Sequence, residues 1–181
     1  MQLRSALRES IPQLPLPTPS QSAVIVAIDP FSQEEPSLVL TKRTLTVESH
    51  KGQISFPGGY FEPGDTDLKQ TALREFEEEL GAPRESLDTW GCLETVYTHV
   101  NVPIIPWVGL INYKLVFKPN FSEVDRIIFL PLHRLILEGL NPVTAWTGSK
   151  NVQSQGIRVD GELVWGATAR ILMSLKSHLE L

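Results

Sequence analysis

The order of apolar and polar residues along the chain predicts several short strands and two helices. Segments of four or more mainly apolar or β-branched residues, bounded by Gly, Pro and polar turns, are typical of strands. Six segments are expected to be strands: residues 22–29, 36–43, 52–59, 92–100, 103–117 and 126–132. Apolar residues at helical spacing predict helices at 67–80 and 163–179. Because strands and helices alternate irregularly, we expect an α/β or α+β fold around a mixed sheet rather than a regular βαβ series.

The first 21 residues differ from the rest of the chain. A short helix is possible at 2–9, but four prolines within 11–20 remove backbone donors and exclude a helix or central strand there. We therefore expect residues 1–21 to be an arm or short helix and residues 22–181 to form one domain. No continuous apolar run marks a signal peptide, and no window approaches the ~20 apolar residues of a spanning helix.

Composition narrows the class of protein. The 181 residues are 41% hydrophobic and 20% charged, close to the average of globular domains, with a net charge of −5. No basic surface is indicated, so we expect neither a nucleic-acid partner nor a membrane partner, and homodimerisation is left open. Cys92 is the only cysteine, so no intrachain disulfide can form, which fits a cytoplasmic location.

The segment 67–80 carries signals for both ends of a helix. Asp67 is expected to be the N-cap, with Gln70 completing a capping box, and Gly81 to supply the left-handed residue that ends the helix. An apolar stripe faces the core in this arrangement: it consists of Leu73, Phe76 and Leu80.

Three acidic residues of this helix share a second face. Glu75, Glu78 and Glu79 are spaced i, i+3 and i+4 and are expected to point outward, away from the apolar stripe. Like charges at this spacing repel, the C-terminal end of a helix disfavours anions, and Arg74 is the only cation nearby. A solvated acidic face is the ordinary explanation for such a run. A divalent cation would relieve the repulsion, and three carboxylates form an all-oxygen set suited to Mg²⁺ or Mn²⁺.

The loop before the helix contains the dipeptide Gly58-Gly59. Without a Cβ, its backbone can approach a ligand closely or present a carbonyl to a metal. An ordinary tight turn would use the same residues, so this signal gains its weight from the adjoining acidic helix.

From Gly59 to Gly81 the sequence resembles the box of the Nudix family, G-x5-E-x7-R-E-U-x-E-E-x-G-U, where U is a bulky aliphatic residue. Gly59 matches the first glycine, and residues 74–81, REFEEELG, match the second half with Phe in the aliphatic position. Asp65 stands where the first Glu is expected, with eight residues rather than seven between it and Arg74, and Ala82 ends the motif where a bulky residue is expected.

The longer spacing resembles the coenzyme A pyrophosphatase branch of that family. This branch also carries an upstream signature, L-L-T-x-R-[SA]-x3-R-x3-G-x3-F-P-G-G, and residues 39–59 are similar to it. The positions that fit are Leu40, Thr41, Arg43, Gly52, Phe56, Pro57, Gly58 and Gly59. Thr44 replaces a small residue, and Glu48 replaces an arginine, which reverses a charge.

The resemblance implies an α/β/α sandwich with a central mixed sheet and hydrolysis of a nucleoside diphosphate linked to another group. For coenzyme A the products would be 3′,5′-ADP and 4′-phosphopantetheine. Carried over by position, Glu75, Glu78 and Glu79 would bind the metal, joined by the carbonyl of Gly59. Arg74 would hold Glu75 or Glu78 by an ion pair.

The proton acceptor for the attacking water is expected to be Glu78, with Glu123 and His99 as alternatives. Glu123 is otherwise an ordinary surface acid, and His99 a structural or exposed histidine in a loop.

Substrate contacts are expected from cations of the signature region. Arg43, His50 and Lys51 are candidates for the phosphate oxygens, although each also fits a surface charge. Trp107 and Trp165 are candidates for stacking on adenine, although aromatic residues more often belong to the core.

Two other functions remain open. Glu48 removes a plausible phosphate contact and so favours a pyrophosphatase for ADP-ribose or nucleotide sugars. A module that binds a nucleotide without cutting it is the third hypothesis, and the intact glutamates at 75, 78 and 79 argue against it.

Overall fold

The structure is a computed structural model, and it describes residues 22–32, 35–46 and 51–179. The expected arm and short helix within residues 1–21 lie outside this part of the chain, as do Glu48 and His50. In the described ranges, no helix is both long and apolar enough to cross a membrane.

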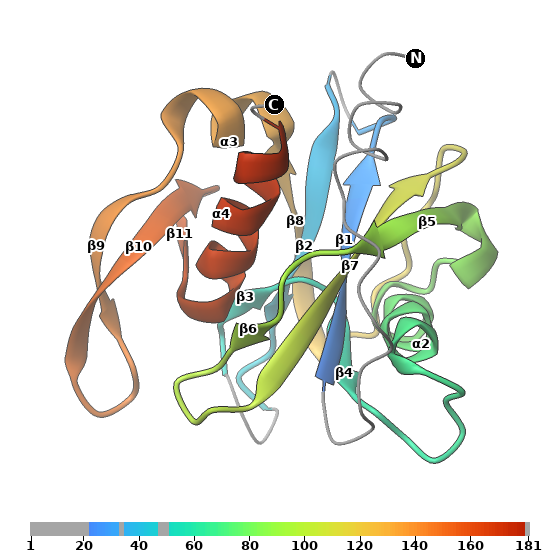
Figure 1. Ribbon diagram of the computed structural model, residues 1–181, viewed down its shortest axis with the longest axis horizontal. Coiled ribbons are helices and arrows are strands. Elements are labelled where there is room, and N and C mark those ends of the chain that lie inside the picture. Colours follow the sequence, from blue (N-terminus) through green and yellow to red (C-terminus); the bar gives the residue numbers. More distant parts are fainter. Residues whose placement is uncertain (1–21, 33–34, 47–50, 180–181) are drawn as a thin grey trace.

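A mixed sheet of eight strands forms the centre of the molecule (Figure 1). Its strands are β1 (Ser22–Asp29), β2 (Ser37–Arg43), β3 (Ile54–Ser55), β4 (Gly58–Tyr60), β5 (Leu87–Cys92), β6 (Val96–Tyr97), β7 (Pro103–Ile111) and β8 (Val124–Pro131). The main order is β3-β2-β1-β7-β5, with β4 paired to β1, β6 to β7 and β8 to β2. The central pair β1 and β7 is parallel, whereas the other pairs are antiparallel.

Helices cover both faces of this sheet. The helix α2 (Leu68–Leu80) packs on one face, followed by the 3₁₀ turn η1 (Arg84–Ser86). On the other face lie α3 (Leu132–Glu138), α4 (Gly166–Leu179) and a three-stranded antiparallel sheet (Figure 1). The small sheet has the order β11-β10-β9 and consists of β9 (Asn141–Trp146), β10 (Asn151–Val159) and β11 (Glu162–Trp165).

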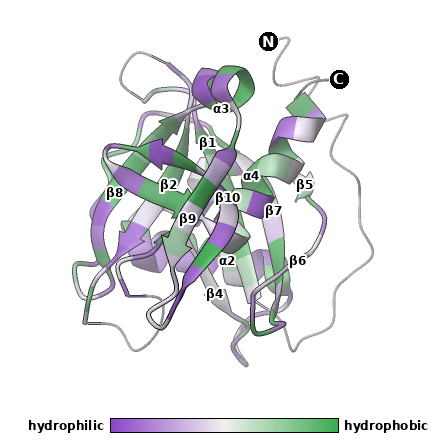
Figure 2. Ribbon diagram, turned by 90° about the vertical axis from the view of Figure 1, so that its left-hand side faces the viewer, coloured by the Kyte–Doolittle hydropathy of each residue, from purple (hydrophilic) through white to green (hydrophobic). Residues whose placement is uncertain are grey.

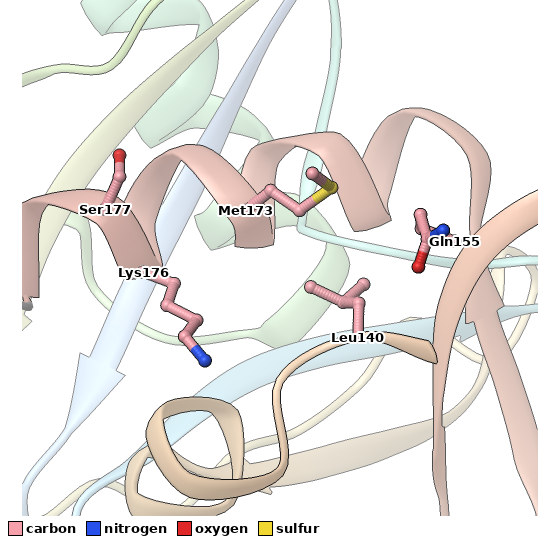
Figure 3. Close-up of a pocket in the computed structure, with 5 residues that line it drawn as sticks. All are labelled: Leu140, Gln155, Met173, Lys176 and Ser177. Atoms are coloured by element: carbon pink, nitrogen blue, oxygen red, sulfur yellow. The ribbon is translucent and has the colours of Figure 1, made fainter. Parts of the chain in front are cut away.

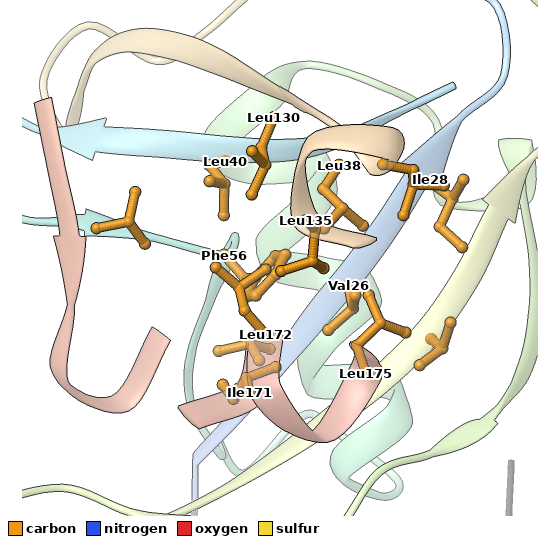
Figure 4. Packing of buried hydrophobic residues seen from close by; sticks show 14 of the residues in the cluster. Val26, Ile28, Leu38, Leu40, Phe56, Leu130, Leu135, Ile171, Leu172 and Leu175 are labelled. Atoms are coloured by element: carbon orange, nitrogen blue, oxygen red, sulfur yellow. The ribbon is translucent and has the colours of Figure 1, made fainter. Parts of the chain in front are cut away.

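The residues of β1 show why the sheet needs a layer on each side. Val26 and Ile28 point into the core on the α4 side, where Figure 4 shows Val26 near Leu175. Ile25 and Ala27 point the opposite way, into the core beneath α2. A strand that is apolar on both faces must be covered on both faces. The predicted α/β/α arrangement around a mixed sheet is thereby confirmed.

The prediction of strand 92–100 is largely wrong. The strand of this region is β5, which ends at Cys92, and only the two residues of β6 follow it. The pairing of β5 with β7 shifts register between Thr89 and Gly91, so the regular alternation that marks a strand is broken. The strand expected at 103–117 ends at Ile111.

The C-terminal third also differs from the prediction. The hairpin β9–β10 and helix α3 were not expected. The hairpin was missed because β10, NVQSQGIRV, is mostly polar and β9 begins with Asn-Pro, which is unusual in a strand. Figure 2 turns this hairpin toward the viewer and shows hydrophilic and hydrophobic residues mixed along it. The closing helix starts at Gly166 rather than at 163, since residues 163–165 pair with β10 as part of β11.

Candidate active site

Helix α2 forms as its end signals predict. The Asp67 side chain accepts a hydrogen bond from the Gln70 backbone N–H at 2.8 Å, which is one half of a capping box. At the other end Gly81 adopts φ 60° and donates to the Glu77 carbonyl at 2.9 Å. Phe76 and Leu80 are fully buried beneath the sheet. The helix is thus fixed by its apolar stripe, and its acidic residues are held in defined positions.

Arg74 connects the acidic residues to the loop before the helix. Its Nη1 donates to Glu75 Oε1 at 2.9 Å and to Glu78 Oε2 at 2.8 Å. Its other two nitrogens bind both carboxylate oxygens of Asp65, at 3.0 and 3.2 Å, and the Tyr60 carbonyl at 3.1 Å. The ion pair expected with Glu75 or Glu78 therefore joins both of them at one nitrogen.

Asp65, which stands where the box has its first Glu, anchors Arg74. Burial would by itself raise the pKa of Asp65, but hydrogen bonds from Arg74, the Glu62 backbone N–H and the Thr71 hydroxyl outweigh it and lower the pKa. Asp65 is therefore ionised. It binds Nε and Nη2 of the Arg74 guanidinium, whereas the two glutamates bind Nη1. Sequence reasoning noticed this departure from the motif but did not assign it a role.

Glu75 lies directly against the backbone of Gly59. A Cβ at Gly59 would come within 2.2 Å of Glu75 Oε1, so a side chain there would displace the carboxylate. Burial raises the pKa of Glu75, Arg74 opposes this, and the charges of Glu78 and Glu123 raise it further. The glycine is required because it leaves room for an acid that already lies in a negative environment.

The prediction that all three glutamates face outward is wrong for Glu79. Its side chain is only 3% exposed and lies under β2, where Thr41 Oγ1 is 3.4 Å from Oε2 and Arg43 Nη1 is 3.6 Å from Oε1. Glu79 follows Phe76 by three residues, so it borders the buried stripe of the helix. Burial raises its pKa to about 8, against the opposing effect of Arg43.

The loop that leads into β8 brings Glu123 to the same place. This loop docks on the end of α2, where the backbone N–H of Asn120 donates to the Glu79 carbonyl at 2.9 Å. The carbonyl of Glu123 accepts from the Thr44 N–H at 2.8 Å, and its carboxylate raises the pKa of Glu75 and Glu79. Glu123 therefore lies near the acids of α2, which is the position that a general base at this site would need.

The remaining candidates are more scattered. Lys51 is exposed in the turn before β3, and His99 is exposed in a turn closed by hydrogen bonds between Thr98 and Val102. Trp107 is partly buried and packs against the core beneath α2, which fits the alternative of a core residue. Trp165 lines a cavity next to Lys51.

Thr41 was missed by sequence reasoning as a neighbour of the acids. It contacts Glu79, which lies 38 positions further along the chain. In the sequence, this contact was signalled only by the presence of Thr41 in the upstream signature. Arg43, the candidate for phosphate oxygens, lies beside Glu79, and its Nε is buried with no hydrogen-bond partner among the described residues.

The donor set fits a hard divalent cation. Within the described ranges, no three acidic, His or Cys side chains are arranged as a ready-made metal cluster, because Arg74 joins Glu75 to Glu78 while Glu79 faces Arg43. All candidate ligands are nonetheless oxygens, and the pKa values of Glu75 and Glu79 are raised first by burial and then by neighbouring acids, whose charge a cation would offset.

The family model of the NUDIX domain matches residues 19–145 of the chain. The chain therefore belongs to the Nudix family, and it is a Nudix hydrolase, an enzyme of phosphorus-containing anhydrides. Among its relatives are two proteins described as uncharacterized Nudix hydrolase NudL. The one from Yersinia enterocolitica is 30% identical over 88% of this chain and 82% of its own length. The one from Photorhabdus laumondii is 31% identical over 93% of this chain and 94% of its own length.

Solved structures support the fold. An Ap4A hydrolase from C. elegans matches with a TM-score of 0.54 at 20% identity, covering 66% of this chain and 86% of its own. The NUDIX domain of Shewanella oneidensis NrtR, solved with ADP ribose, matches with a TM-score of 0.50 at 18% identity, covering 66% and 77%. Nudix hydrolases generally use divalent metal ions, which agrees with the all-oxygen donor set of α2.

Replacing Glu79 with Gln should stabilise the metal-free protein at alkaline pH. The folded pKa of about 8 exceeds the ordinary value of 4.5, so folding favours the protonated acid. This contribution is complete below about pH 4.5 and is lost as the pH rises through about 8. Glutamine imitates the protonated acid at every pH. The melting temperature of the variant should therefore equal that of the wild type near pH 4.5 and exceed it at pH 8.

Divalent metal should raise the wild-type melting temperature, since an ion that binds only the folded state stabilises it.

If the Glu79→Gln variant were markedly less stable than the wild type at pH 8 without metal, Glu79 would be a structural partner of Arg43 instead.

Proposed function

We propose that this Nudix hydrolase cleaves the pyrophosphate bond of coenzyme A or its derivatives, giving 3′,5′-ADP and 4′-phosphopantetheine, with Mg²⁺ or Mn²⁺ as cofactor. The observation that carries the proposal is that the two motifs meet in space. Thr41 and Arg43 of the upstream signature contact Glu79, and Gly59, which ends it, lies against Glu75. The residues that resemble the coenzyme A branch thus border the acids of the hydrolytic box.

In this proposal Glu75, Glu78, Glu79 and the Gly59 carbonyl hold the metal. Mg²⁺ or Mn²⁺ bound there would offset the negative charge of the pyrophosphate and lower the pKa of a bound water. Arg74 positions Glu75 and Glu78 through its shared Nη1, and Asp65 fixes Arg74 in turn.

Glu78 is the proposed general base. Its side chain is 55% exposed, the most accessible of the three glutamates, and its Oε2 is oriented by Arg74 at 2.8 Å. It can therefore reach a water beside the substrate and accept its proton, a step typically worth ~10²–10⁴-fold in rate. Glu123 is the first alternative, supported by its electrostatic effect on Glu75 and Glu79, and His99 is the second.

The substrate phosphates need cations that the acids do not already occupy. Lys51 is exposed and suits this role, whereas Arg43 lies 3.6 Å from Glu79 and is better explained as the partner of that acid. His50 stays a candidate from the sequence. The cytoplasmic location, a homodimer and the single domain at 22–181 likewise stay predictions.

A pyrophosphatase for ADP-ribose or nucleotide sugars is the second candidate. It is favoured by Glu48, which reverses a charge in the coenzyme A signature. The 3′-phosphate of coenzyme A distinguishes the two, since ADP-ribose lacks it.

Dephospho-coenzyme A should be a poorer substrate than coenzyme A by roughly 10- to 150-fold in kcat/KM. A charge-assisted contact to the 3′-phosphate is worth ~1.5–3 kcal/mol, and it is lost with that phosphate. The measurement is kcat/KM for coenzyme A, dephospho-coenzyme A, ADP-ribose and UDP-glucose, each with Mg²⁺ and with Mn²⁺. Equal rates for the first two compounds, with faster cleavage of ADP-ribose, would overturn the coenzyme A proposal in favour of the second candidate.

A further inference from the structure

A cavity of about 450 Å³ lies outside the acidic site, and none of the acids of α2 lines it. It is enclosed by the tip of the β9–β10 hairpin, by β11 and by residues 51–53 before β3. Its volume lies within the ~300–1,000 Å³ range of pockets that bind small ligands. In Figure 1 the hairpin tip lies at the lower left of the molecule, and β3 lies between the hairpin and β4.

The lining of this cavity combines a flat aromatic surface with a cation. Trp146 ends β9 and is 60% exposed, although it is among the largest side chains of the protein. The turn after it is closed by the Thr147 N–H, which donates to the Lys150 carbonyl at 3.0 Å, so the indole is carried by an ordered hairpin. Trp165 and the exposed Lys51 line the same space.

The acid in the wall of the cavity is already neutralised. Glu162 Oε1 accepts from Lys42 Nζ at 2.6 Å and from Arg126 Nη2 at 2.7 Å. Lys42 Nζ also lies 4.0 Å from Asp125 Oδ2, so the two cations balance two carboxylates, and Lys51 supplies the positive charge that favours an anionic ligand.

Two successive residues of β2 connect the cavity wall and the acids of α2, from opposite faces of the strand. Arg43 donates its backbone N–H to the carbonyl of Gln53, a lining residue, at 3.0 Å, and the Arg43 side chain lies beside Glu79. The preceding residue, Lys42, reaches Glu162 in the cavity wall. A ligand whose pyrophosphate lies at the glutamates would have to pass around β3 to place its other end in this space.

We propose that this cavity binds the adenosine 3′-phosphate end of the substrate, with adenine stacked on Trp146 and the 3′-phosphate facing Lys51. The inference rests on the proposed function and assigns a site to one half of its substrate. The pantetheine arm is uncharged and lacks a flat ring, so it would gain from neither the indole nor the cation. Bases, in contrast, stack on aromatic side chains, and phosphates are attracted to lysine.

A second cavity, between α4 and the hairpin, does not suit this role (Figure 3). Its volume of about 230 Å³ is below the range of ligand pockets. Its cation, Lys176, donates to the Ile136 carbonyl at 2.9 Å and is already engaged.

The test is calorimetric titration of the protein with 3′,5′-ADP and with AMP in the presence of Mg²⁺. Trp146→Ala should weaken both nucleotides by about 5- to 150-fold, because both lose the stacking surface. Trp146→Phe should restore most of the affinity. Lys51→Ala should weaken 3′,5′-ADP by roughly 10- to 150-fold and leave AMP nearly unchanged, since only the former has a 3′-phosphate. Tyr113→Ala is the matched control, because Tyr113 is an exposed aromatic residue that follows β7 and does not line the cavity.

Unchanged binding of both nucleotides by Trp146→Ala would overturn the cavity assignment, even if coenzyme A is cleaved. So would a wild-type protein that binds neither nucleotide. If Trp146→Ala and Lys51→Ala act as expected in a protein that does not cleave coenzyme A, the cavity assignment stands and the proposed substrate fails. Melting temperatures of all variants exclude misfolding as the cause of weaker binding.

Discussion

Replacing Glu78 with Gln should lower the rate of pyrophosphate hydrolysis by at least ~100-fold. The substitution keeps the shape of the side chain but removes the charge proposed to bind a metal and the basic oxygen proposed to accept a proton. Arg74 Nη1 would keep its contact with Glu75, so the local structure should persist. Steady-state kinetics at saturating Mg²⁺, with the melting temperature measured beside it, provide the check.

Glu77→Gln is the matched control for this experiment. Glu77 is the adjacent residue on the same helix, but its carboxylate accepts from Arg84 Nε at 2.7 Å instead of joining Arg74. Its loss should leave the rate near that of the wild type. If both variants, or neither, lost activity, the assignment of Glu78 would be wrong.

Replacing Arg74 with Ala should destabilise the protein by about 3 kcal/mol or more. The Asp65 side chain is only 5% exposed and has both oxygens bound to Arg74, so the variant leaves an almost buried carboxylate without its cation. Urea unfolding at pH 7 measures the loss. Adding Asp65→Asn should recover part of it, because the stranded charge is then removed as well.

Arg84→Ala provides the comparison. The Arg84–Glu77 pair also joins an arginine to an acid of α2, but both side chains are more than one third exposed. Exposed pairs contribute about 0–1 kcal/mol, so this loss should be small. Equal losses for the two variants would show that Arg74 acts as an ordinary surface cation, contrary to its role as the anchor of the acids.

Helix α2 could be predicted because its signals are local. The N-cap, the left-handed glycine and the apolar stripe all lie within 15 residues, from Asp67 to Gly81, and each depends on near neighbours. The strands β1, β2 and β8 were equally readable, since they are rich in β-branched or aliphatic residues and cross the core.

The environment of each acid could not be predicted in this way. Helical spacing placed Glu79 with Glu75 and Glu78, but it could not show that β2 covers that position and brings Arg43 to it. The hairpin β9–β10 was missed for a related reason. Its strands are largely polar because they form an outer sheet held by pairing between residues 141–146 and 151–156, and Ile157 and Val159 at the end of β10 reach the core.

The most direct test of the central claim is to identify the products of coenzyme A hydrolysis by mass spectrometry, with Mg²⁺ and again with EDTA. The account predicts 3′,5′-ADP and 4′-phosphopantetheine in equal amounts with the metal, neither of them with the chelator, and full recovery when Mg²⁺ is restored. Cleavage that continues in EDTA, or metal-dependent cleavage at a bond other than the pyrophosphate, would contradict it.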